Sequence, residues 1–318
     1  MTSFSFVFRK SVFSTLLLLA GTSLCFSDTV TLRPVADTAL YQNEPDNNLG
    51  GEFTIPVGAT ETNNAGGFDI NRGLVKFDIA AAVPSNASIS SVMLSVTVVR
   101  VPAAATPDTD SIFSLQRMLR IWGEGTNQSN IGSPSGSLAE AGQATWKARF
   151  YPNVLWSVPG AAAPVDFTNT VSATTFIRGT NTYTFNSTSI LVADVQAWLN
   201  NPTANFGWIL RSENEIKEFT NRRFASREDT TNAPSLLIEY SLPASTIKFS
   251  QIELAGAKVN LFFAVEANRA YAVEFRNELA SGVWPTLTNV LSPVAVSNYM
   301  VSDSFSSAIN RFYRIRSP

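Results

Sequence analysis

Apolar and polar residues alternate along most of this chain, and two neighbouring runs show the alternation most clearly. The first run, RGLVKFDI at residues 72–79, places an apolar row on one face of a strand, made of Val75, Phe77 and Ile79. The second run, SISSVMLSVTV at residues 88–98, changes phase near Ser90–Ser91, which predicts a β-bulge. We therefore predict two antiparallel strands with one face in the core and the other in water.

The same patterns predict one short helix and further strands before residue 243. Residues 190–199 have apolar positions at helical spacing, with Asn186 or Ser187 as the expected cap and Pro202 as the expected stop. Further strands are expected within residues 29–42, 53–58, 111–122, 183–185, 205–213, 222–229 and 234–242.

The character of the chain changes after Pro243. Five short apolar runs follow at regular spacing with turn residues between them, at residues 246–254, 258–266, 269–277, 280–290 and 311–317. We predict an all-β protein with two domains. Residues 28–242 are expected to form an antiparallel β-sandwich, and residues 243–318 a small Ig-like β-sandwich.

Residues 1–27 have the pattern of an export signal. Two basic residues precede a short apolar core, and small residues precede the expected cut between Ser27 and Asp28. The apolar core is too short to span a membrane, and no other segment qualifies. We therefore expect a secreted protein exported by a Sec-type signal. Lipid attachment at Cys25 is the less favoured alternative, because Leu24 stands where such signals have a small residue.

Composition narrows the classes of function. The chain has a formal net charge of -2, which gives no long-range attraction to nucleic acid. It contains no histidine, which excludes Ser-His-Asp and Cys-His catalysis and histidine zinc sites. Its only cysteine, Cys25, lies in the expected signal, so no disulfide is expected in the mature chain.

Three segments in this order resemble the DNRLRE-type domain, of the same group as the alginate-binding carbohydrate-binding module family 96. They are residues 72–96, 190–213 and 223–240, and the resemblance covers residues 28–242. The matching positions are Arg72, Leu74, Phe77, Asp78, Ser226, Arg227, Glu228, Pro234 and Tyr240. The resemblance implies that residues 28–242 form a jelly-roll-like β-sandwich of a secreted bacterial protein, a domain often attached to enzymes or cell-surface chains that handle polysaccharides. The long loop from Gly123 and the lack of an enzyme domain depart from the family layout.

The C-terminal part resembles small β modules at the ends of exported proteins of Verrucomicrobia-like bacteria. It lacks the apolar helix and basic tail of a sorting signal.

Four basic residues are the first candidate binding site. Strand alternation places Arg72 and Lys76 on one side of their strand, and Arg223 and Arg227 on one side of theirs. If the two strands are neighbours, these cations line a groove that suits the carboxylates of uronate sugars. The alternative is that they are solvated or ion-paired, with Arg227 bound to Glu228 or Asp78.

An aromatic group and an acidic loop are the other candidates. Of the aromatic residues, Trp156 is the one expected to be exposed for sugar stacking, while most of the group is expected in the core. Clustered oxygen ligands in an early loop suggest a structural Ca²⁺ site, the alternative being a solvated acidic loop. The aromatic group is Trp122, Trp146, Tyr151, Trp156 and Trp208, and the loop ligands are Asp37, Glu44, Asp46 and Asn47.

These observations together favour a secreted, non-catalytic protein that binds an extracellular polysaccharide, such as the acidic polymer alginate. The alternative is a structural cell-surface or matrix protein with protein partners and no sugar ligand. The carboxylates are scattered along the sequence and mark no acid-base pair, so we do not expect an enzyme.

Overall fold

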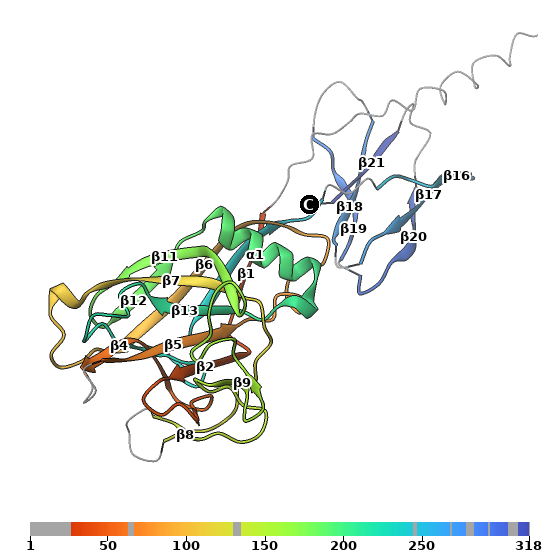
Figure 1. The fold of residues 1–318 in the computed structure, drawn as a ribbon. Coiled ribbons are helices and arrows are strands. Elements are labelled where there is room, and N and C mark those ends of the chain that lie inside the picture. Colours follow the sequence, from red (N-terminus) through yellow and green to blue (C-terminus); the bar gives the residue numbers. More distant parts are fainter. Residues whose placement is uncertain are drawn as a thin grey trace, which may run out of the picture. The chain divides into compact units, whose positions relative to one another are not determined.

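The computed structural model of the protein describes residues 27–62, 67–129, 135–243, 247–267, 269–277, 283–291, 293–304 and 311–317. The chain divides into two compact units, a larger one at Ser27–Pro243 and a smaller one that begins at Ala244 (Figure 1). The expected signal lies outside the described residues, except for Ser27. No helix in the described ranges is long and apolar enough to cross a membrane.

The larger unit is an antiparallel β structure with a single α-helix among its described residues. Its helical elements are α1 (Ser189–Asn200), η1 (Pro107–Thr109) and η2 (Pro202–Ala204). Its strands are β1 (Ser27–Leu32), β2 (Ala36–Tyr41), β3 (Asn47–Asn48), β4 (Thr54–Thr62), β5 (Phe68–Lys76), β6 (Ser88–Arg100), β7 (Ser111–Met118), β8 (Ser137–Leu138), β9 (Ala148–Phe150), β10 (Val154–Leu155), β11 (Phe167–Ile177), β12 (Asn181–Phe185), β13 (Trp208–Ser212), β14 (Arg222–Ala225) and β15 (Ser235–Ser241).

One curled sheet forms both layers of this sandwich. Its strand order is β1-β15-β6-β14-β4-β5-β13-β7-β11, with β12 also paired to β6 and β2 to β5. Strand β4 belongs to both layers, because residues 54–57 pair with β14 whereas residues from Gly58 onward pair with β5. Gly58 has a φ of 113° and lies against the carbonyl of Thr220, a backbone geometry that favours glycine. The all-β sandwich expected from the pattern is confirmed.

The main core lies between the layers and contains the apolar rows that the pattern identified. Val75, Phe77 and Ile79 are buried in it, as is the apolar row of β6. The phase change in β6 is a register shift, since Ser91 lies opposite Glu239 and Ile89 opposite Tyr240, so the predicted bulge is confirmed. A buried Trp pair, Trp198 and Trp208, fixes α1 on this core with ring centroids 4.5 Å apart.

The N-cap of helix α1 lies one residue after the later of the two expected positions. The Oγ1 atom of Thr188 accepts the N–H of Leu191 at 3.0 Å, so Thr188 is the N-cap and the prediction of Asn186 or Ser187 was wrong. The helix ends at Asn200, just before Pro202, as predicted.

A second core covers the outer face of β2, β5, β7 and β13, and for β5 this is the face that the pattern had assigned to water. Residues 119–129 and 135–166, here called the cover segment, pack onto that face. Figure 1 shows their strands β8 and β9 on the side of β2. The residues of this core are Leu40, Leu74, Met118, Trp122, Ala144, Trp146, Trp156, Ala161, Phe167 and Ile209. The prediction that β5 has one wet face was therefore wrong.

The smaller unit is a β-sandwich of two three-stranded antiparallel sheets among the described residues, ordered β16-β17-β20 and β19-β18-β21. Its core lies between them and includes Leu261, Phe263, Tyr271 and Val273. Strand β20 was not among the predicted runs. The strands are β16 (Gln251–Ala255), β17 (Lys258–Val265), β18 (Tyr271–Arg276), β19 (Thr286–Val290), β20 (Ser297–Ser304) and β21 (Phe312–Arg316).

Candidate functional site

Arg72, the first of the predicted ligand-binding cations, is held inside the protein under the cover segment. Its Nε and Nη2 atoms donate to the two carboxylate oxygens of Glu215, each at 2.8 Å, and Nη1 donates to the carbonyl oxygens of Gly160 and Ala161, each at 2.8 Å. The guanidinium also lies over the ring of Trp146. The prediction that Arg72 contacts a ligand was wrong, because its hydrogen bonds and stacking are taken up within the fold.

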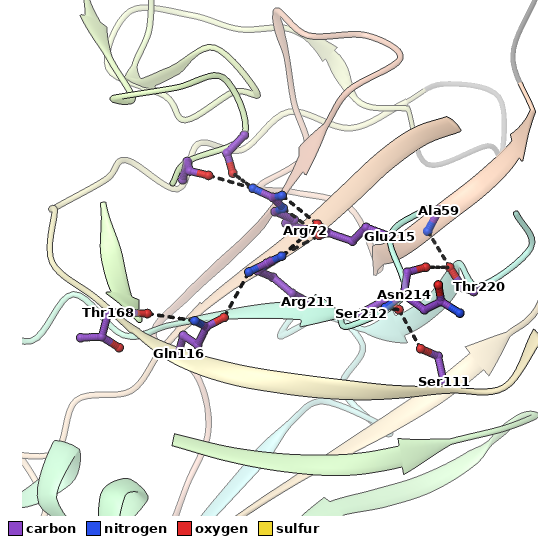
Figure 2. Close-up of polar contacts among 12 residues, drawn as sticks. Ala59, Arg72, Ser111, Gln116, Thr168, Arg211, Ser212, Asn214, Glu215 and Thr220 are labelled. Atoms are coloured by element: carbon purple, nitrogen blue, oxygen red, sulfur yellow. Dashed lines mark hydrogen bonds and ion pairs between the residues drawn. The ribbon is translucent and has the colours of Figure 1, made fainter. Parts of the chain in front are cut away.

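Glu215 is the centre of a polar network that fixes the segment between β13 and β14 (Figure 2). Arg211 donates to its Oε2 atom at 3.0 Å and also to Gln116, which in turn donates to the carbonyl of Thr168. Burial by itself raises the pKa of Glu215, but the hydrogen bonds and positive charges of Arg72 and Arg211 outweigh it and lower the pKa. Glu215 is therefore a carboxylate that its two arginines hold ionised.

The far end of the same segment is fixed by hydroxyl groups (Figure 2). Thr220 accepts the N–H of Ala59 at 2.9 Å and donates to the carbonyl of Asn214, while Ser212 accepts the N–H of Asn214. Residues 213–221 are thus anchored to the sheet at both ends. This matters because the segment carries two residues of the cleft described below.

Arg227, the second predicted cation, is also ion-paired. It lies beyond the end of β14, so strand alternation does not apply to it, and it donates from Nε and Nη2 to the carboxylate of Glu124 and contacts Glu228 at 3.1 Å. Its backbone N–H donates to Asp37 at 2.7 Å. Burial, then the negative charge of Glu228, raises the pKa of Asp37 well above its usual value. The alternative for Arg227, an ion pair with Glu228, is therefore confirmed, and a contact of Arg227 with a ligand stays a prediction.

Arg223, in contrast, lies at an open cleft of about 340 Å³ in the larger unit. It is directly opposite Arg100 of β6, and paired residues of antiparallel strands project from the same face. The register shifts at this point, so that Phe224 is opposite Val98 and Val99 is left without a partner. This bulge brings Arg100 to the side of Arg223.

Neither arginine of the cleft is neutralised by the described residues. No carboxylate of the described chain lies within ion-pair distance of Arg100 or Arg223. Arg72 of β5 and Arg211 of β13, in contrast, both pair with Glu215. Burial, followed by the neighbouring charge of Arg100, lowers the pKa of Arg223. Two like charges therefore share a partly enclosed space, and an anion that enters the cleft relieves their repulsion.

The other walls of the cleft are one aromatic ring, one amide and an apolar edge. Phe219 has a φ of 60°, a left-handed conformation that is strained for a bulky side chain. The Oδ1 atom of Asn221 is buried and has no hydrogen-bond partner. Residues 101–104 form the apolar edge, and Thr60 completes the lining. Cationic, amide and flat apolar groups therefore surround one space.

The four predicted cations do not converge. Lys76 ends β5, is half-buried and lies opposite Ala36, away from the residues that line the cleft. Of the predicted set only Arg223 lies in the cleft, and its partner Arg100 was missed. The available signal was the position of Arg100 at the end of the longest alternating run, before Pro102. The identity of its neighbour depends on strand order, which the pattern does not contain.

Trp156 is buried rather than exposed. Its side chain is 4% exposed, and its Nε1–H donates to the carbonyl of Thr145 at 2.9 Å. It belongs to the second core with Trp122 and Trp146, so the stacking role predicted for Trp156 was wrong. The interpretation of most of the aromatic group as core is confirmed for its four tryptophans.

The acidic loop does not gather its predicted Ca²⁺ ligands. Asp46 pairs with Lys147 at 2.7 Å and the amide of Asn47 donates to the carbonyl of Ser135, whereas Asp37 belongs to the Arg227 cluster. The backbone carbonyl of Glu44 accepts the N–H of Asn47 at 2.9 Å. Across the part of the chain that the structure describes, no three acidic, His or Cys side chains are grouped to hold a metal ion. A Ca²⁺ site stays a prediction.

Comparison with known proteins adds no assignment: no protein-family model matches the chain, and no curated protein matches it significantly in sequence.

Proposed function

We propose that this protein is a secreted, non-catalytic carbohydrate-binding protein that binds an acidic polysaccharide, such as alginate, in the cleft of Arg100 and Arg223. The observation that carries the proposal is that these two arginines face one cleft and have no carboxylate partner among the described residues. Unpaired guanidinium groups bind carboxylates through two parallel hydrogen bonds, which suits the acid group of a uronate sugar.

The remaining lining supports a sugar rather than a small inorganic anion. A volume of about 340 Å³ lies within the range of ligand sites and exceeds what a single anion needs. Phe219 offers an apolar ring for a sugar face, and the unpartnered Oδ1 of Asn221 offers an acceptor for a sugar hydroxyl. The network around Glu215 and Thr220 holds both residues in place before a ligand arrives, which lowers the entropy cost of binding.

Calorimetric titration with alginate oligomers and with a neutral glucan tests the proposal. We expect binding to alginate only, weakening as salt is raised, and we expect Arg100→Gln and Arg223→Gln each to weaken it about tenfold or more, as for the loss of a charged hydrogen bond. Arg120→Gln is the matched control, because Arg120 is exposed and lies outside the cleft. Equal affinity of the double variant and the original chain would refute the proposal.

A structural role without a sugar ligand is the second candidate, and one observation favours it. Ile112 of β7 and Phe176 of β11 are opposite each other and are 44% and 48% exposed, and β11 is the last strand of its sheet. Exposed apolar pairs at a sheet edge can mediate contacts between proteins. Sedimentation velocity of the original chain and of Phe176→Ser distinguishes the candidates, since self-association that the substitution abolishes, without alginate binding, supports the structural role.

A further inference from the structure

The outer face of the β19-β18-β21 sheet in the smaller unit is basic. Alternate residues of β18 and β21 point into the core, among them Tyr271, Val273, Tyr313 and Ile315. The residues between them lie on the outer face, where Glu274 is opposite Arg314, Ala272 is opposite Arg316 and Arg276 is opposite Phe312. Three arginines therefore occupy one side of two adjacent strands.

Only one carboxylate of the described chain neutralises these three arginines. Glu274 is buried and accepts Nε of Arg314 at 2.6 Å and Nη2 of Arg316 at 3.3 Å. Arg276 has no ion pair with any described residue, and its Nη2 atom is buried without a hydrogen-bond partner. Three positive charges against one negative charge leave a local charge of +2, and one guanidinium has unmet donors.

Trp284 orients two of these guanidinium groups. The Cζ atoms of Arg276 and Arg314 lie over its ring, 5.2 Å and 4.5 Å from the centroid. A guanidinium held over an aromatic ring keeps N–H groups at the edge of its own plane, and an anion can accept those that solvent reaches. The stacking therefore fixes the donors in advance, which reduces the entropy cost of binding an anion.

We propose that the Trp284 face, defined as Arg276, Trp284, Arg314 and Arg316, is a second binding site, which takes the carboxylate or sulfate groups of an acidic polysaccharide. Nucleic acid fits it less well, because the one ring already carries guanidinium groups and offers no free platform for bases. An anionic membrane surface is recognised by clusters of about four to eight basic residues, more than this face has. The site lies in the other unit from the cleft and does not depend on ligand binding there.

Tryptophan fluorescence can observe this face in the full chain. The chain has six tryptophans, and five of them are buried in the larger unit, so Trp284 is the one that solvent reaches. Acrylamide, a neutral quencher, should therefore quench mainly Trp284, and Trp284→Phe should remove most of that quenching. The titrations are made in the Arg100→Gln/Arg223→Gln background, so that binding at the cleft does not contribute.

Alginate oligomers and dextran sulfate are the two polyanion probes, with neutral dextran as the uncharged control. We expect one or both polyanions to reduce acrylamide quenching, Arg276→Gln to weaken that binding about tenfold, and Lys258→Gln to leave it unchanged, because Lys258 lies in the other sheet. The response to each polymer shows whether carboxylate or sulfate is preferred. Failure of both polyanions to protect Trp284, or stronger protection by single-stranded DNA or anionic vesicles, would overturn the proposal.

Discussion

Replacement of Arg72 by alanine is expected to destabilise the larger unit. The substitution removes two hydrogen bonds to Glu215 and two to the carbonyl oxygens of Gly160 and Ala161, all at 2.8 Å. It also removes the cation over the ring of Trp146. The hydrogen bonds to Gly160 and Ala161 and the contact with Trp146 join the sheet to the cover segment, so the substitution weakens the packing of the cover segment on the sheet.

The size of the effect follows from what remains after the substitution. Loss of one partner from a buried ion pair costs about 3–5 kcal/mol when the other charge is left alone. Glu215 keeps Arg211 at 3.0 Å, so we assign the ion pair about 1–2 kcal/mol. The two carbonyl oxygens that lose a charged donor add about 1–3 kcal/mol. The total of about 2–5 kcal/mol corresponds to a fall in Tm of roughly 4–20 °C for a domain of this size.

Urea unfolding followed by tryptophan fluorescence measures this change, because five of the six tryptophans lie in the larger unit. Arg178→Ala is the matched control, since the side chain of Arg178 is 70% exposed and its ion pair with Asp110 is long, at 3.9 Å. We expect the control to lose less than about 1 kcal/mol. A loss for Arg72→Ala no larger than that of the control would refute the reasoning and would mean that other contacts hold the cover segment.

Two further predictions concern pH. Because burial and the charge of Glu228 raise the pKa of Asp37, the folded chain holds this proton more tightly than the unfolded chain, and stability falls as pH rises through the folded pKa. Asp37→Asn should therefore raise Tm at pH 7 but change it little at pH 4, and a constant difference across that range contradicts this account. In the smaller unit, burial and Asp303 raise the pKa of Tyr313 to about 12, above the value of about 10 in the unfolded chain. The stabilisation that comes from the protonated Tyr313 hydroxyl is complete below pH 10 and is lost as pH rises through 12. Calorimetry should therefore show that the Tm of Tyr313→Phe falls less steeply with pH above 10 than the Tm of the original chain.

The main core could be predicted because its signal is local in the sequence. Alternation in residues 72–79 and 88–98 identified the buried row, and the change of phase at Ser90 identified the bulge, since each depends only on adjacent residues of one strand. The end of α1 before Pro202 was equally predictable, because proline lacks the N–H that continues a helix.

The second core was missed although the strands carry a sign of it. Leu74 and Val75 are adjacent in β5, and Leu74 lies in the second core whereas Val75 lies in the main core. In β13, Ile209 and Leu210 are divided between the two cores in the same way. Two successive apolar residues in a strand indicate that both faces are buried, whereas we gave weight to the charges beside them. The covering residues lie far along the chain, so the local context of Arg72 and Trp156 could not show that they would be enclosed.

The cleft itself depends on strand order, which alternation does not determine. Arg223 is found from its own strand, but its pairing with Arg100 requires β14 to lie beside β6, and these strands are separated by more than half of the larger unit. The roles of Phe219 and Asn221 depend on a segment without regular structure, which the hydrogen bonds of Glu215, Ser212 and Thr220 position.

The pairing of β1 with β15 has a mechanical consequence. Ser27 lies opposite Ser241 at one end of this antiparallel ladder, and Leu32 lies opposite Leu236 at the other. Tension applied between the two ends of the larger unit therefore acts on a single pair at a time and peels β1 from β15, rather than shearing all the hydrogen bonds together. A pull on the chain before Ser27 and after Pro243 therefore breaks the β1–β15 pairing before it loads the rest of the sheet.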